Sequence, residues 1–171
     1  MTYNGRNPIT PCGYGNDIGN FTGIKTITVG DKNFYMPRWR GFDNPFGDIW
    51  TNVDGCVLKI PNMYIILNKE DYTDSLDNIK YSRRYSTLPI TNGNIKSLQL
   101  GEYADMVPKT IGDSATTYMC DYYWQNSNLN TLLVGGGVNY GSDAGLACFD
   151  GDPSVGLASA IVGARGVFVK D

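Results

Sequence analysis

The 171-residue sequence contains no histidine. Histidine is the usual general base of Ser/His/Asp and Cys/His systems and a common ligand of catalytic zinc, so its absence excludes most of those mechanisms. Carboxylate chemistry remains open, but most of the 17 acidic residues, for example Asp31, Asp74 and Asp113, lie in turn-like segments. Such side chains commonly bond to the backbone of their own turn. We therefore expect no catalytic residue and no cofactor.

Metal-binding motifs are also missing. Cys12, Cys56, Cys120 and Cys148 include no CxxC spacing, which leaves zinc and thioredoxin-like sites without support. Free, mostly buried thiols are the favoured interpretation, and a disulfide is the alternative. The run Asp150-Gly151-Asp152 looks like part of a calcium loop but lacks the closing glutamate of the twelve-residue motif. We expect a surface turn there and no metal site.

Long apolar runs and basic patches are absent as well. No stretch approaches the ~20 apolar residues of a membrane span, and the formal net charge is −3. Arginines gather only at Arg38–Arg40 and Arg83–Arg84. Nucleic acids and anionic membranes bind basic surfaces. We therefore expect no nucleic-acid partner and no membrane insertion.

Helical heptads are scarce, whereas 21 glycines and 12 tyrosines favour strands and loops. Residues 1–23 have little apolar periodicity and are expected to form an irregular opening loop, cut from a longer parent protein. Residues 24–171 are expected to form a single domain. Within it, Ile24–Val29 and Phe34–Met36, joined by Gly30–Asn33, predict a hairpin.

Further strands are predicted where short runs are rich in β-branched and aromatic residues. These runs are Cys56–Ile60, Tyr64–Leu67, Thr116–Trp124, Thr131–Val134, Ala144–Phe149 and Ile161–Val169. Between them, the sequence predicts a short helix capped near Asp74–Asp77, a loop over residues 88–94 and a mostly exposed connection over residues 95–106.

Two glycine-containing segments need separate interpretation. Gly135–Gly137 lacks the Gly-Lys-Ser/Thr ending and the following helix of a phosphate-binding loop. We interpret these glycines as a place of tight turns and close backbone approach. The segment Trp39–Gly55 places large aromatic rings beside small residues, which predicts a tightly packed corner of the core.

Several motifs resemble one protein family. Phe46–Gly55 is similar to the G-N-[IV]-W-E-W block of the formylglycine-generating-enzyme-like branch of the C-type lectin fold. Gly135–Gly137 and Val162–Val167 look like that branch's R-G-G-S-W … G-F-R-L-V ending. Ser114–Asn126 and Gly141–Leu146 resemble the C-terminal domains of variable proteins that retroelements diversify in gut bacteria and their phages.

The resemblance covers about residues 4–168, and Gly166 departs from it where the family usually has leucine. It implies an α+β domain of C-type lectin fold, with small antiparallel sheets, few helices and much irregular loop. In that family, mutagenesis at template adenines converts AAY codons into NNY codons, which cannot encode Lys, Glu, Gln, Met or Trp. Those five residue types are absent from residues 126–169, although all occur earlier. The composition therefore agrees with a variable C-terminal region.

The resemblance also assigns a set of substitutable, ligand-binding positions. They are Asn139, Tyr140, Asp143, Cys148, Asp150, Asp152, Pro153, Leu157, Ser159 and Ile161. The spacing of the last two with Leu157 predicts a strand with one shared face, whereas most of the others lie in predicted turns. Tyr140 is the strongest single candidate, because tyrosine gives a large contact at low entropic cost. Cys148 suits the core equally well.

A function follows from the resemblance as an expectation. It implies a hypervariable receptor-binding domain of a phage tail fibre or a surface-displayed adhesin, located on a virion or a bacterial surface. The partner would be a cell-surface protein or glycan, and a homotrimer could form through the parent protein. Two alternatives remain open. One is a structural virion or fibre domain without a variable role, and the other is a formylglycine-generating-type enzyme that uses Cys120 and Cys148.

Overall fold

The structure is a computed structural model. It describes residues 2–3, 7–8, 22–39, 42–43, 45–103, 105–137 and 139–164. Most of the expected opening loop, with Cys12, lies outside these residues, as does the end of the chain from Arg165. In the described part of the chain, β1 (Thr2–Tyr3) and β2 (Asn7–Pro8) form a small antiparallel pair.

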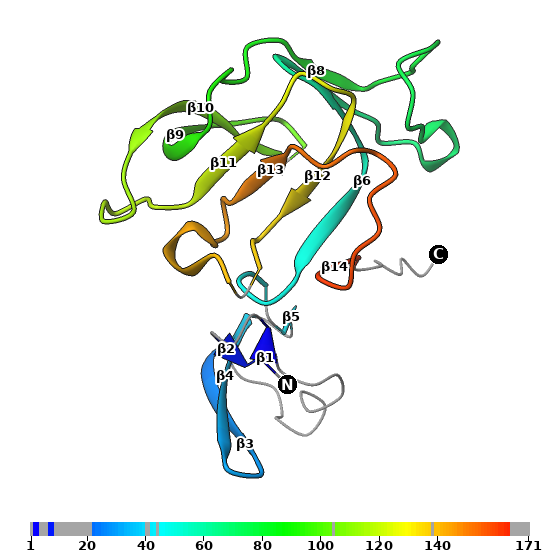
Figure 1. The fold of residues 1–171 in the computed structure, drawn as a ribbon. Coiled ribbons are helices and arrows are strands. Elements are labelled where there is room, and N and C mark those ends of the chain that lie inside the picture. Colours follow the sequence, from blue (N-terminus) through cyan, green and yellow to red (C-terminus); the bar gives the residue numbers. More distant parts are fainter. Residues whose placement is uncertain are drawn as a thin grey trace.

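The N-terminal hairpin is confirmed. β3 (Gly23–Val29) pairs with β4 (Lys32–Trp39), which also pairs with the short β5 (Phe42–Asp43). Val29 lies opposite Lys32, so the turn contains only Gly30 and Asp31 and is tighter than expected. In Figure 1 this hairpin extends below the main body of the domain.

The main body is one nine-stranded mixed sheet (Figure 1). The strand order is β10-β9-β11-β13-β12-β6-β7-β8, and β14 pairs with β6. The pairs β11–β13 and β14–β6 are parallel, and the other pairs are antiparallel. The bounds are β6 (Trp50–Lys59), β7 (Asn62–Ile65), β8 (Arg83–Tyr85), β9 (Gly93–Leu100), β10 (Met106–Asp113), β11 (Tyr122–Gln125), β12 (Asn130–Val134), β13 (Phe149–Gly151) and β14 (Val162–Gly163).

Helix is nearly absent, so the sheet-rich part of the expected fold class is correct. The described residues contain two short 3₁₀ helices, η2 (Lys69–Asp71) and η3 (Gly141–Asp143), and no α-helix. The helix expected near Asp74–Asp77 is wrong. That segment is irregular, and the Ser75 N–H donates to Thr73 Oγ1 (3.1 Å) while the Asp77 N–H donates to Ser75 Oγ (3.0 Å). No helix in the described residues has the length and apolar character that a bilayer crossing requires.

Several strand predictions need correction. The connection expected over residues 95–106 is mostly β9 and the start of β10, and Ile95 is fully buried. Only the end of the predicted run Thr116–Trp124 forms a strand, β11. Likewise, the run Ala144–Phe149 consists mainly of turns and enters β13 only at Phe149.

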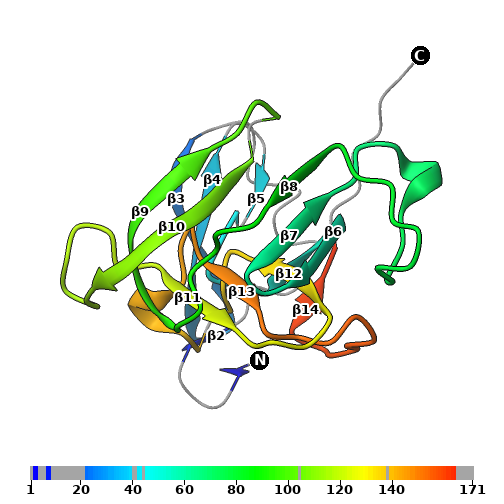
Figure 2. The ribbon, with the colours of Figure 1, turned by 90° about the horizontal axis from the view of Figure 1, so that it is seen from above.

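The principal core lies inside the curl of the sheet. Strands from both ends of the sheet contribute buried side chains to one cluster, including Tyr85 from β8 and Val107 from β10. Figure 2 shows β9 and β10 on one side of this curl and β6, β7 and β8 on the other. Tyr123 from β11 and Phe149 from β13 fill the middle, with ring centroids 5.4 Å apart. Burial of such large rings stabilises the folded state, because each removes much apolar surface from water.

A bend in β6 lets the strand serve two parts of the sheet. Thr51–Val53 before the bend pair with β12, and Cys56–Lys59 after it pair with β7, while Leu58 also lies opposite Asn130 of β12. The bend is at Gly55, which has φ +75°, and a Cβ there would lie 2.7 Å from the Ile66 carbonyl oxygen. Only glycine fits such a backbone without strain.

Candidate ligand-binding surface

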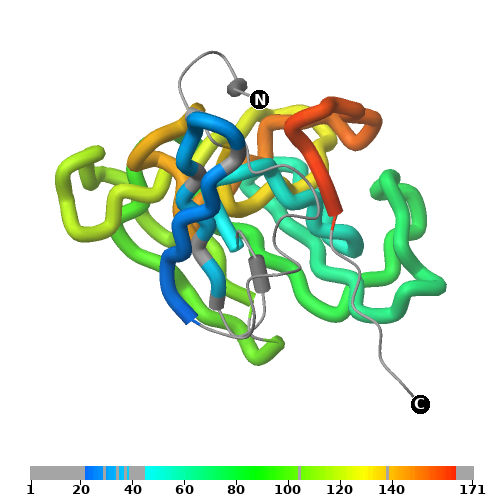
Figure 3. Tube along the Cα trace, turned by 90° about the horizontal axis from the view of Figure 1, so that it is seen from below, coloured from blue at the N-terminus to red at the C-terminus, as the bar shows by residue number. Residues whose placement is uncertain are grey.

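A second, smaller core lies on the other face of the sheet. It consists of Trp50, Leu133 and Cys148, with Tyr140 and Ile161 packed against it. Trp50 is 2% exposed, as the packed corner predicted for the aromatic segment requires, whereas Phe46 is exposed at 39%, so the prediction is correct only in part. This core supports the two connections that carry the candidate residues. We call them the first C-terminal loop, residues 135–148, and the second C-terminal loop, residues 152–161. They lie on opposite sides of β12 (Figures 1 and 3).

The first C-terminal loop is held close to the sheet by glycine. Gly135 and Gly136 have φ of +88° and +75°. A Cβ on Gly136 would lie 2.5 Å from the Cβ of Ala144. The Gly135 N–H donates to the Cys148 carbonyl oxygen (3.2 Å), and the Gly47 N–H donates to the Gly135 carbonyl oxygen (2.9 Å). The interpretation of these glycines as a place of close approach is therefore confirmed.

Tyr140 is partly anchored in the small core. Its ring lies edge-on to Trp50 and to Trp124, with both centroid distances 5.2 Å, and the side chain is half-buried. Asp143, also half-buried, accepts a long hydrogen bond of 3.4 Å from Asn94 Nδ2. Asn139 Oδ1 is buried and accepts no hydrogen bond from the described residues. This end of the surface is therefore more rigid than free turns would be.

Cys148 does not belong to an exposed surface. The side chain is 1% exposed, and burial, followed by the nearby Asp121 charge, raises the pKa of the thiol. A ligand cannot contact it without opening the small core. Cys56, Cys120 and Cys148 are free thiols, as favoured from the sequence, whereas Cys12 lies outside the described residues.

Asp150 is the candidate with the most perturbed environment. It follows the buried Phe149 in β13 and lies opposite Leu133 and Trp124 in the neighbouring strands. Burial raises the pKa of Asp150 to about 6, while the Asp152 N–H, donating to Asp150 Oδ1 at 2.9 Å, opposes the rise. The ionised side chain therefore disfavours the folded state. Residues that cost stability are typical of functional positions.

The second C-terminal loop carries the most accessible candidates. Asp152, Leu157 and Ser159 are exposed, Leu157 at 43%, whereas Pro153 is half-buried. The predicted strand over residues 157–161 is wrong, because residues 157–159 have no regular structure, a turn follows at 160–161 and β14 begins only at Val162. These side chains share a loop and not a strand face.

Main-chain hydrogen bonds fix both ends of this loop. The Thr131 N–H donates to the Pro153 carbonyl oxygen (3.0 Å), and the Trp50 N–H donates to the Ile161 carbonyl oxygen (2.9 Å). Neither bond depends on the identity of the side chain at position 153 or 161. The Leu157 N–H donates to the Ser154 carbonyl oxygen (2.9 Å), which fixes the middle of the loop in the same manner.

One structural residue of this region was missed from the sequence. Asn130 is 1% exposed, and its Nδ2 donates to the Gly151 carbonyl oxygen and to Asn126 Oδ1, both at 2.7 Å. Asn126 Nδ2 in turn donates to Asp152. The sequence signal for this role was an asparagine at the start of an apolar run, because a buried asparagine side chain needs hydrogen-bond partners.

Comparison with protein-family models, with curated proteins and with solved structures finds no match for this chain.

Proposed function

We infer that this protein is a non-enzymatic binding domain whose two C-terminal loops display a changeable side-chain surface to a receptor. The observation that carries the inference is the main-chain anchoring of the second C-terminal loop at Pro153 and Ile161. Exposed side chains on a fixed backbone can change without repacking a core. The receptor is a protein or glycan on a cell surface, and the domain belongs to a phage tail fibre or a bacterial adhesin.

The family resemblance noted in the sequence supports the same proposal. From it we further propose that the domain has the C-type lectin fold and that a retroelement diversifies its gene. Within the candidate set, the contact residues proposed from exposure are Asp152, Leu157 and Ser159, with Tyr140 at the half-buried edge. Cys148 is left out of the contact surface because it is buried.

The enzyme alternative needs a reactive thiolate from Cys120 or Cys148. A buried thiol with a raised pKa, as at Cys148, is a poor nucleophile at neutral pH. Blocking the thiols and measuring receptor binding separates the two functions, because a binding domain keeps its affinity after this treatment. The structural-fibre alternative predicts that the loop positions are constant among sister copies, since a packing surface does not absorb variation.

Nucleotide sequencing of the gene and its downstream flank tests the proposal directly. We expect a near-copy of the codons for residues 126–169 that differs only where the copy has adenine, beside a reverse-transcriptase gene. If the flank contains no such copy, the proposed diversification is wrong, and the remaining functions are those of a fixed binder or a structural fibre domain.

A substitution library tests the same proposal in the protein. Simultaneous replacement of Asp152, Leu157 and Ser159 by NNY-encoded residues should leave most members folded, with a melting temperature within a few degrees of the parent. A matched library at the buried positions Trp50, Leu133 and Cys148 should leave few folded members. Equal losses in the two libraries would contradict the proposed tolerance of the loop.

A further inference from the structure

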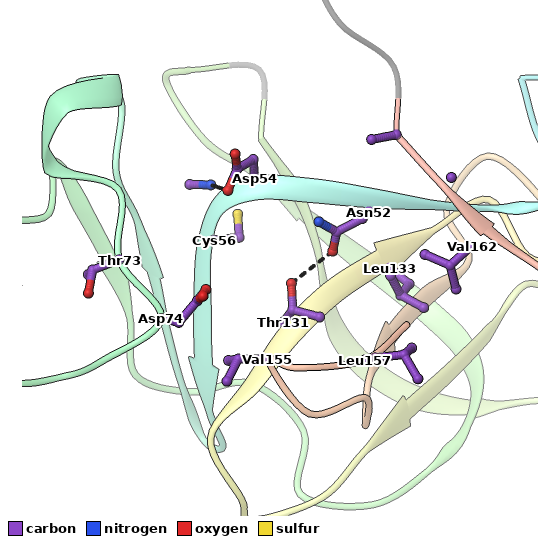
Figure 4. Close-up of a pocket in the computed structure, with 13 residues that line it drawn as sticks. Asn52, Asp54, Cys56, Thr73, Asp74, Thr131, Leu133, Val155, Leu157 and Val162 are labelled. Atoms are coloured by element: carbon purple, nitrogen blue, oxygen red, sulfur yellow. Dashed lines mark hydrogen bonds between the residues drawn. The ribbon is translucent and has the colours of Figure 1, made fainter. Parts of the chain in front are cut away.

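A pocket of about 390 Å³ lies beside the second C-terminal loop. Figure 4 shows its walls: β6 and β12 form one side, the loop following η2 forms another, and the second C-terminal loop with β14 closes the third. This volume is within the range of small-ligand sites. The pocket has one polar end and one aliphatic end. Leu133 and Val162 connect it to the small core, but the rings of Trp50, Trp124 and Tyr140 do not line it.

The polar end presents hydrogen-bond acceptors. Thr131 donates its hydroxyl proton to Asn52 Oδ1 (2.9 Å), so the hydroxyl oxygen offers only lone pairs to a ligand. Asp74 lies across the pocket from Thr131 in Figure 4, and Asp54 lies on β6 at the rim. Both carboxylates are exposed. Among residues 45–103, 105–137 and 139–164, no arginine or lysine lines the pocket, and none forms an ion pair with either carboxylate. The end therefore favours a cation that donates hydrogen bonds.

The opposite end is aliphatic. Leu133 is buried at its base, and Val155, Leu157 and Val162 form its wall. The described lining residues include no aromatic ring, so stacking of a planar group has no partner among them. A flexible alkyl chain can cover these side chains while its polar end reaches the carboxylates, as the stems of long basic side chains do on protein surfaces.

We propose that this pocket binds a primary ammonium group on an alkyl chain, such as the lysine side chain of a protein partner. The acceptors come from three separate elements, namely Asp54 on β6, Asp74 on the loop after η2 and Thr131 on β12. An ammonium group has three N–H donors that point in different directions, whereas a guanidinium presents a flat fork suited to a single carboxylate. The site goes beyond the proposed variable surface, since both carboxylates lie outside residues 126–169.

The test is a titration of the isotopically labelled 171-residue chain with Nα-acetyl-lysine-N-methylamide, followed by NMR chemical-shift changes in low salt. Solvent-exposed ion pairs are weak, so we expect a Kd on the order of 1 mM, and weaker binding in high salt. The shifts should map to Thr131, Leu157, Gly163 and Ala164, which line the pocket. The norleucine analogue, which lacks the ammonium group, should bind at least about tenfold more weakly.

Variants of the carboxylates complete the test. The double variant Asp54→Asn with Asp74→Asn should lose most of the lysine-analogue binding, and both sites are exposed, so the fold is retained. Asp77→Asn, in the same loop but outside the pocket, is the matched control and should bind as the parent does. The arginine analogue is titrated in the same way. The proposal would be overturned if the double variant bound as the parent does, if the shifts mapped elsewhere, or if the norleucine or arginine analogue bound as tightly as the lysine analogue. Such a failure leaves the variable-surface proposal intact, because that proposal does not use either carboxylate.

Discussion

Replacing Asp150 with asparagine removes a carboxylate whose ionisation opposes folding. Burial raises the pKa of Asp150 from 3.8 to about 6. Because the raised pKa belongs to the folded state, the unfolded chain releases this proton first, and the wild-type protein loses stability as pH rises from about 4 to about 7. A pKa difference of about 2, at about 1.4 kcal/mol per pKa unit, corresponds to about 3 kcal/mol. Partial exposure of the side chain reduces this to about 1–3 kcal/mol.

The asparagine keeps the acceptor for the Asp152 N–H but cannot ionise, so its stability lacks this pH dependence. Urea unfolding of both proteins between pH 4 and pH 7.5 measures the difference in free energy of unfolding. As pH rises across that interval, the free energy of unfolding of the variant should increase by about 1–3 kcal/mol relative to that of the wild type. Asp77→Asn, at an exposed position, should differ from the wild type by less than about 0.5 kcal/mol throughout. A pH-independent difference between the Asp150→Asn variant and the wild type would refute the reasoning.

Three other perturbations probe the support of the loops. Trp50→Ala should lower the free energy of unfolding by about 3–5 kcal/mol in urea titrations, whereas Tyr118→Ala, at a fully exposed ring, should be nearly neutral. Gly136→Ala places a methyl group 2.5 Å from a side-chain carbon at positive φ and should lower the melting temperature by several degrees, whereas Gly156→Ala, with nothing within 4 Å, should not. Cys148 should resist iodoacetamide at pH 7.5 in the native protein and react after unfolding, as peptide mass spectrometry would show.

The sequence predicts local features better than long-range ones. The hairpin around Gly30 and the strand Thr131–Val134 are correct, because turn residues and β-branched or apolar runs act over a few neighbours. β9 and β10 were missed because they lie at the end of the sheet, where one face meets solvent. There Lys96 is exposed beside the fully buried Ile95, and such polar residues make a strand look like an exposed connection.

The candidate surface was predictable in position and not in detail. Most of the segments that carry it are loops, but the surface turn expected at Asp150–Asp152 is wrong, because Asp150 and Gly151 belong to β13. Nor does the sequence reveal that Tyr140 packs on Trp50 or that Cys148 lies under the first C-terminal loop. Those facts depend on contacts between residues far apart in the chain. The spacing of Leu157 and Ile161 fits a strand, yet no strand in the described part of the chain pairs with that segment, so it forms an irregular loop and a turn. Strand geometry needs a partner that spacing alone does not supply.

The bent strand β6 has a consequence for how the domain is made. Asn52 pairs with Leu133, and Trp50 pairs with Val162. The first half of β6 therefore pairs with segments that the ribosome synthesises much later. Folds dominated by such distant pairings form slowly, and their unpaired strands are prone to aggregate in the meantime. During synthesis, the half of β6 before Gly55 therefore has no partner until β12 is made, whereas the half after Gly55 can pair at once with β7. A chaperone that binds extended segments would find its target there, around Trp50–Val53, and would release it only when β12 arrives.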